Sequence, residues 1–191
     1  GGYDKNFTYL ITCSRTGTQA IVDAAIDTNE ITHYLRNDPV AILITHGHSD
    51  HIAFLDNYVK EYPGATILGH PDSRLKEGYP NFKKVDNNQE FIIGEMRFKC
   101  IHTPGHYFDS ICYQISPVLF TGDTMFVGRT GRIKGKYSSI EDLYDSIYNK
   151  ILEMPGSIKI YPGHDYGDKP NITLEENILN SPLLSANSLD E

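Results

Sequence analysis

A stretch of six residues, His46–His51 (HGHSDH), holds three imidazoles and one carboxylate. Imidazole and carboxylate groups are ligands that zinc, iron and manganese accept in proteins. In an extended loop, His46 and His48 project to the same side, whereas Asp50 and His51 can turn toward a second position. The spacing therefore predicts a loop that supplies two adjacent metal ions. The alternative is a polar surface loop that is rich in histidine by chance, which the clustering of three of the eight histidines disfavours.

Three more metal-type ligands occur later in the chain, and each directly follows a glycine. Taken alone, each would be weak evidence, because a single histidine near a turn is more often structural. Together with the histidine-rich loop, they put ligand side chains after four separate apolar segments, where α/β folds usually carry their chemistry. We therefore predict one metal cluster from seven residues: His46, His48, Asp50, His51, His106, Asp123 and His164.

The elements that must position these ligands are short strands and helices that alternate along the chain. Apolar runs typical of strands cover residues 7–13, 19–22, 40–45, 65–68, 91–93, 96–101, 110–115, 118–121 and 157–161. Spacings of three and four between apolar residues, or helix boundary signals, predict helices over residues 29–37, 52–62, 71–76, 140–152 and 174–180. The order predicts a layered α/β arrangement with two sheets in the middle, as one domain over residues 1–191.

The composition excludes several classes of partner. A formal net charge of -8 disfavours nucleic acid, whose binding needs a basic face. No apolar run approaches the length of a membrane span, and no signal peptide is visible, so we expect a cytoplasmic protein. The three cysteines are odd in number and form no C-x-x-C pair, which predicts buried, reduced thiols.

The short sequence motifs around the predicted ligands resemble those of a known family. They are TH at 45–46, TPGH at 103–106, GDTMF at 122–126 and YPGHDY at 161–166. With the H-x-H-x-D-H loop, they resemble the metallo-β-lactamase fold superfamily, and in particular its glyoxalase II-like branch of hydroxyacylglutathione hydrolases. The similarity runs from about residue 7 to residue 182. It implies a four-layer αββα sandwich with the metals at one edge, between the sheets.

The resemblance also implies how the ligands are shared between two metal ions. One ion would take His46, His48 and His106, the other Asp50, His51 and His164, with Asp123 between them. Zinc is the expected metal, with iron and manganese as alternatives. Two such ions can activate a water as a hydroxide nucleophile, and Asp50 could also orient that nucleophile as a catalytic residue. The resemblance narrows the reaction to hydrolysis of a thioester, such as a hydroxyacyl-glutathione.

A basic, glycine-rich loop follows Asp123 and is a candidate for substrate binding. Four cationic residues lie within eight positions of this otherwise acidic chain, and they include Arg129 and Arg132. In the resembling enzymes a basic residue of this loop contacts glutathione, and Arg132 falls at about that place. The alternative is a solvated charged loop. Asp23, at the end of a predicted strand, is either a partner of a ligand histidine or a turn residue.

Two rival functions remain on the same residues. A persulfide dioxygenase of the same fold would bind one iron through His46 or its neighbour, His106 and Asp123. A non-catalytic binding module would be expected to lack a ligand, and none is lacking. The three remaining histidines, His33, His70 and His102, match no motif and are predicted to be structural or exposed.

Overall fold

The first half of the chain forms a five-stranded sheet in the computed structural model, which describes residues 2–186 and 188. Its strands, in spatial order, are β1 (Tyr9–Thr12), β2 (Gln19–Val22), β3 (Ala41–Leu43), β4 (Thr66–Gly69) and β5 (Phe82–Lys84). β1 and β2 form an antiparallel hairpin, and the remaining strands pair in parallel. All three residues of β3 are buried, as expected for a parallel strand covered on both faces.

The second half forms a six-stranded sheet that is mostly antiparallel. Its strands, in spatial order, are β13 (Ile172–Thr173), β12 (Lys159–Pro162), β9 (Val118–Gly122), β8 (Ile111–Ile115), β7 (Met96–His102) and β6 (Glu90–Ile93). A separate small hairpin joins β10 (Met125–Phe126) to β11 (Arg129–Thr130). Strands β7, β9 and β12 run in the same direction, so their C-terminal ends meet at one edge of the sheet.

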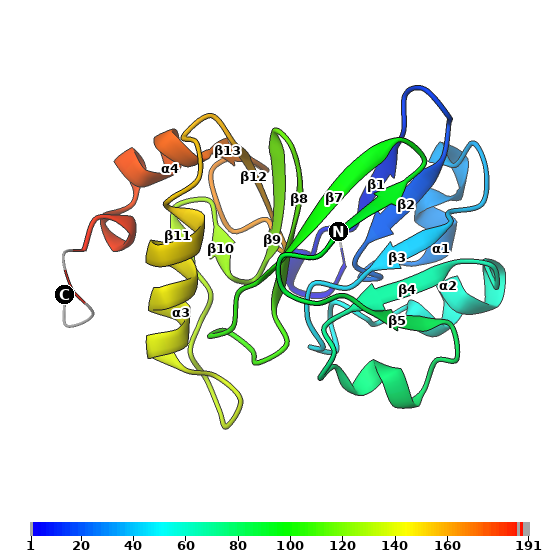
Figure 1. Cartoon of the computed structure of the whole chain (residues 1–191), viewed down its shortest axis with the longest axis horizontal. Coiled ribbons are helices and arrows are strands. Elements are labelled where there is room, and N and C mark those ends of the chain that lie inside the picture. The colour runs from blue at the N-terminus through cyan, green and yellow to red at the C-terminus, as the bar shows by residue number, and fades with distance from the viewer. Residues whose placement is uncertain (1, 187, 189–191) are drawn as a thin grey trace.

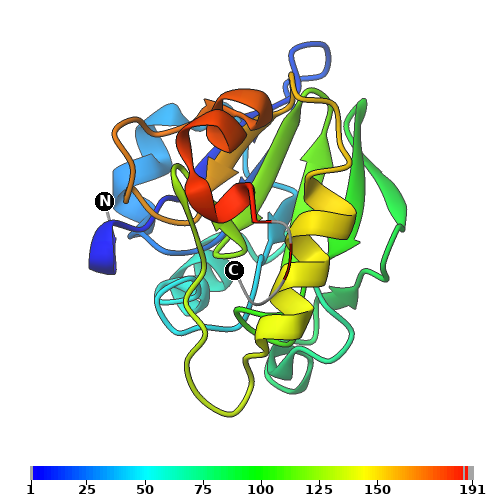
Figure 2. The same ribbon diagram turned by 90° about the vertical axis from the view of Figure 1, so that its left-hand side faces the viewer.

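Helices cover the outer face of each sheet, so that the order of layers is helix, sheet, sheet, helix (Figure 1). The helices are α1 (Thr28–Ile31), α2 (Leu55–Glu61), α3 (Ile140–Ser146) and α4 (Leu174–Asn180). Side chains of α1 and α2 pack on the first sheet, and those of α3 and α4 pack on the second. A third buried cluster lies between the sheets. Figure 2 shows α3 and α4 in front of the second sheet. The expected α/β sandwich is confirmed.

Several predicted element boundaries are wrong. The helix expected over residues 71–76 is a short 3-10 turn, Arg74–Glu77, and it follows a separate turn in which the N–H of Ser73 donates to the carbonyl of His70 at 2.9 Å. In place of the helix expected over residues 29–37, the structure has the short helix α1 followed by a 3-10 turn, Thr32–Tyr34. The helix over 52–62 starts only at Leu55, and that over 140–152 continues after α3 as a π-helical turn, Ile147–Ile151.

The described residues also confirm the expected burial of the cysteines. All three cysteines are buried and unpaired. Among residues 2–186 and 188, no helix is long and apolar enough to span a bilayer.

Candidate metal centre

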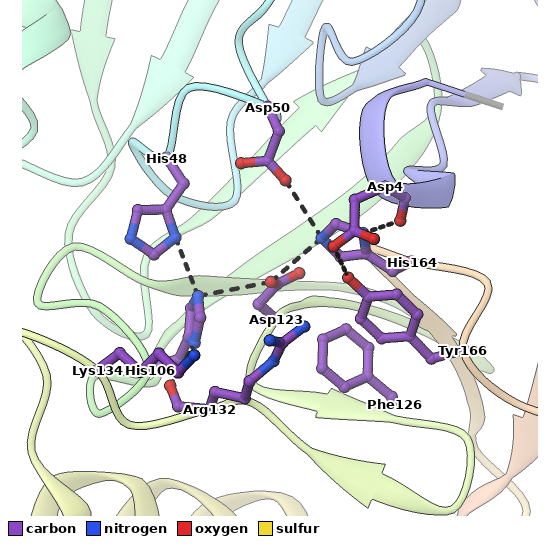
Figure 3. Close-up of a pocket in the computed structure, with 10 residues that line it drawn as sticks. All are labelled: Asp4, His48, Asp50, His106, Asp123, Phe126, Arg132, Lys134, His164 and Tyr166. Carbon is purple, nitrogen blue, oxygen red and sulfur yellow. Dashed lines mark hydrogen bonds and ion pairs between the residues drawn. The ribbon is translucent and has the colours of Figure 1, made fainter.

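The seven predicted ligands lie together at one edge of the sandwich, after the ends of four strands. The histidine-rich loop follows β3 of the first sheet, while His106, Asp123 and His164 follow β7, β9 and β12 of the second. The backbone N–H of Ile111 donates to the carbonyl of Thr45 at 2.7 Å, which ties the histidine-rich loop to the second sheet. Figure 3 shows five of the seven side chains converging on one cavity.

A first group of ring nitrogens comes from His46, His48 and His106. The Nδ1 atom of His48 lies 3.0 Å from Nε2 of His46 and 3.0 Å from Nε2 of His106. Burial, helped by nearby histidines, lowers the pKa of each of these three imidazoles, so they are neutral at pH 7. Two neutral rings share at most one proton per contact, and three converging nitrogens therefore suit a cation better than hydrogen bonds among themselves.

A second group comes from Asp50, His51 and His164. The Nε2 atoms of the two histidines lie 3.3 Å apart. Oδ2 of Asp50 lies 3.4 Å from Nε2 of His164 and 3.8 Å from Nε2 of His51. The carboxylate oxygen and the two imidazole nitrogens all lie within 4.8 Å of one another. Together they form a donor set that zinc, iron or manganese accepts.

Asp123 lies between the two groups and faces both. Its Oδ1 atom is 3.2 Å from Nε2 of His51, and its Oδ2 atom is 3.3 Å from Nε2 of His164 and 3.5 Å from Nε2 of His106. Burial would raise the pKa of this carboxyl, but His51 and His164 outweigh it and hold the pKa well below its usual range. Oδ1 is buried and accepts no hydrogen bond from the described residues. An anionic, buried oxygen without a donor is the environment that a bound cation satisfies.

The outer ring nitrogens of the candidate ligands are held by hydrogen bonds. Nδ1 of His106 donates to the carbonyl of Arg132 at 2.8 Å, and Nδ1 of His164 donates to the carbonyl of Asp4 at 2.9 Å. A proton on Nδ1 leaves the lone pair of Nε2 free to point into the site. The backbone therefore selects the tautomer that a metal ligand needs.

Asp23 holds His51 in the same way. Its Oδ2 atom accepts from Nδ1 of His51 at 2.8 Å, and both of its oxygens accept from Thr45, at 2.8 Å each. Burial alone would lower the pKa of His51, but Asp123 and Asp23 raise it well above its usual value. Asp23 is therefore the partner of a candidate ligand histidine, which was one of the two roles left open by the sequence.

The cavity above the cluster has a volume of about 220 Å³ and a cationic rim. Arg132 and Lys134 line it on one side, and Phe126 and Tyr166 on another (Figure 3). Arg129 does not line it. Its guanidinium carbon lies 5.9 Å from the centre of the Tyr166 ring.

Two residues of the site, Asp4 and Asn6, precede β1 and were not predicted from the sequence. Asp4 lines the cavity, and its carboxylate accepts a hydrogen bond from the hydroxyl of Tyr166. Asn6 is buried beside Asp50. An isolated polar residue ahead of a strand has no spacing pattern that would reveal it. The other three histidines lie outside the cluster, as predicted: His33 is exposed, and the rings of His70 and His102 stack on each other.

Known proteins match this chain over most of its length. The model of the Metallo-beta-lactamase superfamily matches residues 1–164, a range that includes all seven candidate ligands. The probable polyketide biosynthesis zinc-dependent hydrolase PksB of Bacillus subtilis (strain 168) is 29% identical, covering 90% of this chain and 78% of the relative. The probable hydroxyacylglutathione hydrolase glo2 of Schizosaccharomyces pombe is 31% identical, covering 96% and 73%. The crystal structure of ETHE1 from Myxococcus xanthus has a TM-score of 0.87 at 26% identity, covering 98% and 83%.

Proposed function

Because the chain belongs to the metallo-beta-lactamase superfamily, we propose that it is a binuclear metallohydrolase that cleaves a thioester, such as a hydroxyacyl-glutathione. The observation that carries this proposal is the pair of ligand groups that share Asp123. One ion would be held by His46, His48 and His106, and the other by Asp50, His51 and His164. Two divalent ions, with zinc expected, would lower the pKa of a water and polarise the substrate carbonyl when bound.

The residues around the cluster have distinct roles in this proposal. Asp50 has a side chain that is 30% exposed to the cavity, so it can orient the attacking water as well as bind an ion. Arg132 and Lys134 attract the carboxylates of a peptide-like thiol at the rim. A thiolate is a good leaving group, so the proposed cleavage needs no proton donor.

The relatives support the chemistry at two levels. PksB is described as a zinc-dependent hydrolase, which supports a hydrolase and zinc for this chain. The fission-yeast relative is described as a probable hydroxyacylglutathione hydrolase, which supports a glutathione thioester. We therefore expect a small-molecule substrate, and the acidic net charge of -8 disfavours nucleic acid.

A mononuclear-iron persulfide dioxygenase is the alternative. It would use His46 or His48 together with His106 and Asp123, which lie in the same cluster. Such an enzyme does not need the second group, yet Asp50, His51 and His164 are complete and converge. That completeness favours the hydrolase.

The test is a comparison of two reactions on the same purified protein. We expect zinc-loaded protein to release the thiol from hydroxyacyl-glutathione, and chelation to abolish this release until zinc is restored. Asp123→Ala should lower kcat by ~100-fold or more, since it removes the group shared by both ions. Asp72→Ala, an exposed control, should be unaffected. If the protein consumes oxygen with glutathione persulfide and does not cleave the thioester, the hydrolase proposal is contradicted and the dioxygenase is supported.

A further inference from the structure

The segment that precedes β1 crosses the metal cluster and puts Asn6 beside the second ligand group. Asn6 pairs with His164 as an isolated antiparallel bridge, and the N–H of Phe7 donates to the carbonyl of Gly163 at 2.8 Å. These contacts attach the segment to the end of β12, while its continuation enters β1 of the other sheet. Asn6 therefore lies where the loops of both sheets meet.

The side chain of Asn6 is buried and is directed at Asp50. Only 1% of Asn6 is exposed, and its Nδ2 atom donates to Oδ2 of Asp50 at 2.9 Å. Nδ2 also lies 3.4 Å from Nε2 of His164. The Asp50 carboxylate can only accept, which fixes the amide with its nitrogen toward the cluster. Oδ2 is also the Asp50 oxygen that lies near His51 and His164.

Packing alone does not hold the Asp50 carboxylate in this orientation. Its side chain is 30% exposed, and the residue lies in a turn rather than on a helix or strand. The hydrogen bond from Asn6 therefore selects Oδ2 to face the second group and leaves Oδ1 toward the cavity. A carboxylate that is fixed in advance binds an ion more tightly than one that must be ordered on binding.

The other end of the Asn6 amide gives an independent indication. Its Oδ1 atom is buried and has no hydrogen-bond donor among residues 2–186 and 188. Burying an amide oxygen without a donor costs free energy, so packing alone does not explain an asparagine at this position. The donor set next to Asn6 is the one formed by Asp50, His51 and His164.

We propose that Asn6 is a positioning residue of the second ion site: it orients Asp50 and thereby sets the affinity for the second of two divalent ions. This inference rests on the proposed binuclear function. Asn6 acts through Asp50 and touches no reacting group. Its loss should therefore lower the affinity for the second ion and leave the affinity for the first ion unchanged.

The test is a titration of metal-free protein with Co²⁺, followed by calorimetry and by visible absorption. Asn6→Leu keeps a side chain of four heavy atoms branched at Cγ but removes the donor, and Asn6→Ala removes the side chain beyond Cβ. Gln19→Leu is the matched control, because Gln19 is also a buried amide, 1% exposed, but lies in β2 away from the cluster. We expect both Asn6 variants to bind the second equivalent of Co²⁺ ~10–100-fold more weakly than wild type does, and the absorption band of that equivalent to change. The first equivalent should bind as tightly as it does in wild type.

If the Asn6 variants bind the first and the second equivalent as tightly as wild type does, the role of Asn6 is overturned and the binuclear proposal stays intact. A wild-type protein that takes up only one equivalent would overturn both. If Asn6→Leu fails to fold, Asn6→Ala gives the same measurement. A loss of second-ion affinity in Gln19→Leu equal to that in the Asn6 variants would assign the effect to general destabilisation and contradict the proposal.

Discussion

At the scale of single residues, the contact between Asp23 and His51 has a direct consequence for metal affinity. We expect Asp23→Asn to weaken binding of the second ion by ~10–100-fold, because an amide nitrogen would face Nδ1 of His51 in place of the accepting oxygen. A competition titration with a coloured chelator measures this. Asp145→Asn, at a position whose side chain is 51% exposed, should bind both ions as wild type does. Unchanged affinity in Asp23→Asn would show that His51 needs no partner.

A second prediction at this scale concerns His70, whose ring stacks on His102. Burial, together with His102, lowers the pKa of His70 to about 4. In the unfolded chain its pKa is about 6.5, so between these values only the unfolded state binds the proton. The contribution to the free energy of unfolding is therefore complete above pH 6.5 and is lost as the pH falls toward 4. In urea denaturation of metal-free protein, His70→Gln should lose less stability between pH 7 and pH 5 than wild type. Equal losses would contradict the assignment.

The candidate ligands are the part of the cluster that the sequence indicated most clearly, because their residue types are unusual and their spacing is tight. All seven lie within one cluster. Asp4 and Asn6 could not be predicted, since their role depends on a tertiary contact with the end of β12. Arg129 and Arg132 illustrate the same limit: both belong to one basic loop, but only Arg132 lines the cavity.

At the scale of elements, the position of His106 depends on how closely its loop approaches α3. Gly105 has a φ of +133°, and a Cβ atom there would lie 2.3 Å from the backbone of Leu143. The N–H of Ser139, which caps α3, donates to the carbonyl of Gly105 at 2.9 Å. The ligand loop and the helix therefore form one unit, and neither can move alone.

We expect Gly105→Ala to lower the free energy of unfolding by ~2 kcal/mol or more, through backbone strain and the clash with α3. The first ion should also bind more weakly, because His106 would shift. Gly64→Ala is the control, since nothing lies within 4 Å of a Cβ there. It should change stability by no more than ~0.5 kcal/mol in the same urea titration. Similar stability of the two variants would refute the close packing.

Elements with a recognisable apolar pattern were predictable, and two-residue strands or strands rich in lysine were not. The expected strand over residues 19–22 and the expected helix over 174–180 have the predicted bounds. β5 contains Lys83 and Lys84, as edge strands often do, and therefore lacks an apolar pattern. β10, β11 and β13 have two residues each, too few for any period. They exist because neighbouring strands supply their hydrogen bonds.

At the scale of the whole molecule, the two sheets are joined near the site by the side chain of Tyr113. This tyrosine lies on β8, and its hydroxyl is 3.1 Å from the carbonyls of both Ile44 and Leu68 in the first sheet. Because it is fully buried, the hydroxyl replaces water for these carbonyls. Pairing of the sheets could not be read from local patterns. The order of the elements indicated two central sheets, and the family resemblance implied the αββα order of the layers. The extent of a single domain over residues 1–191 stays a prediction, with residues 1, 187 and 189–191 outside the described part.

We expect Tyr113→Phe to lower the free energy of unfolding by ~1 kcal/mol, the usual net value of one buried hydrogen bond. Denaturant titration should show this loss with an unchanged slope, since the surface exposed on unfolding is the same. Tyr3→Phe, at a position that is 68% exposed, is the control and should have no effect. A Tyr113→Phe protein as stable as wild type would show that the hydroxyl does not join the sheets.

The central claim is that one molecule holds two divalent ions in the two ligand groups that share Asp123. The most direct test is elemental analysis of protein purified without added metal, with the ions counted per chain. We predict about two ions per chain, mainly zinc, together with thioester cleavage. About one iron per chain, with oxygen consumed on addition of glutathione persulfide, would contradict the claim.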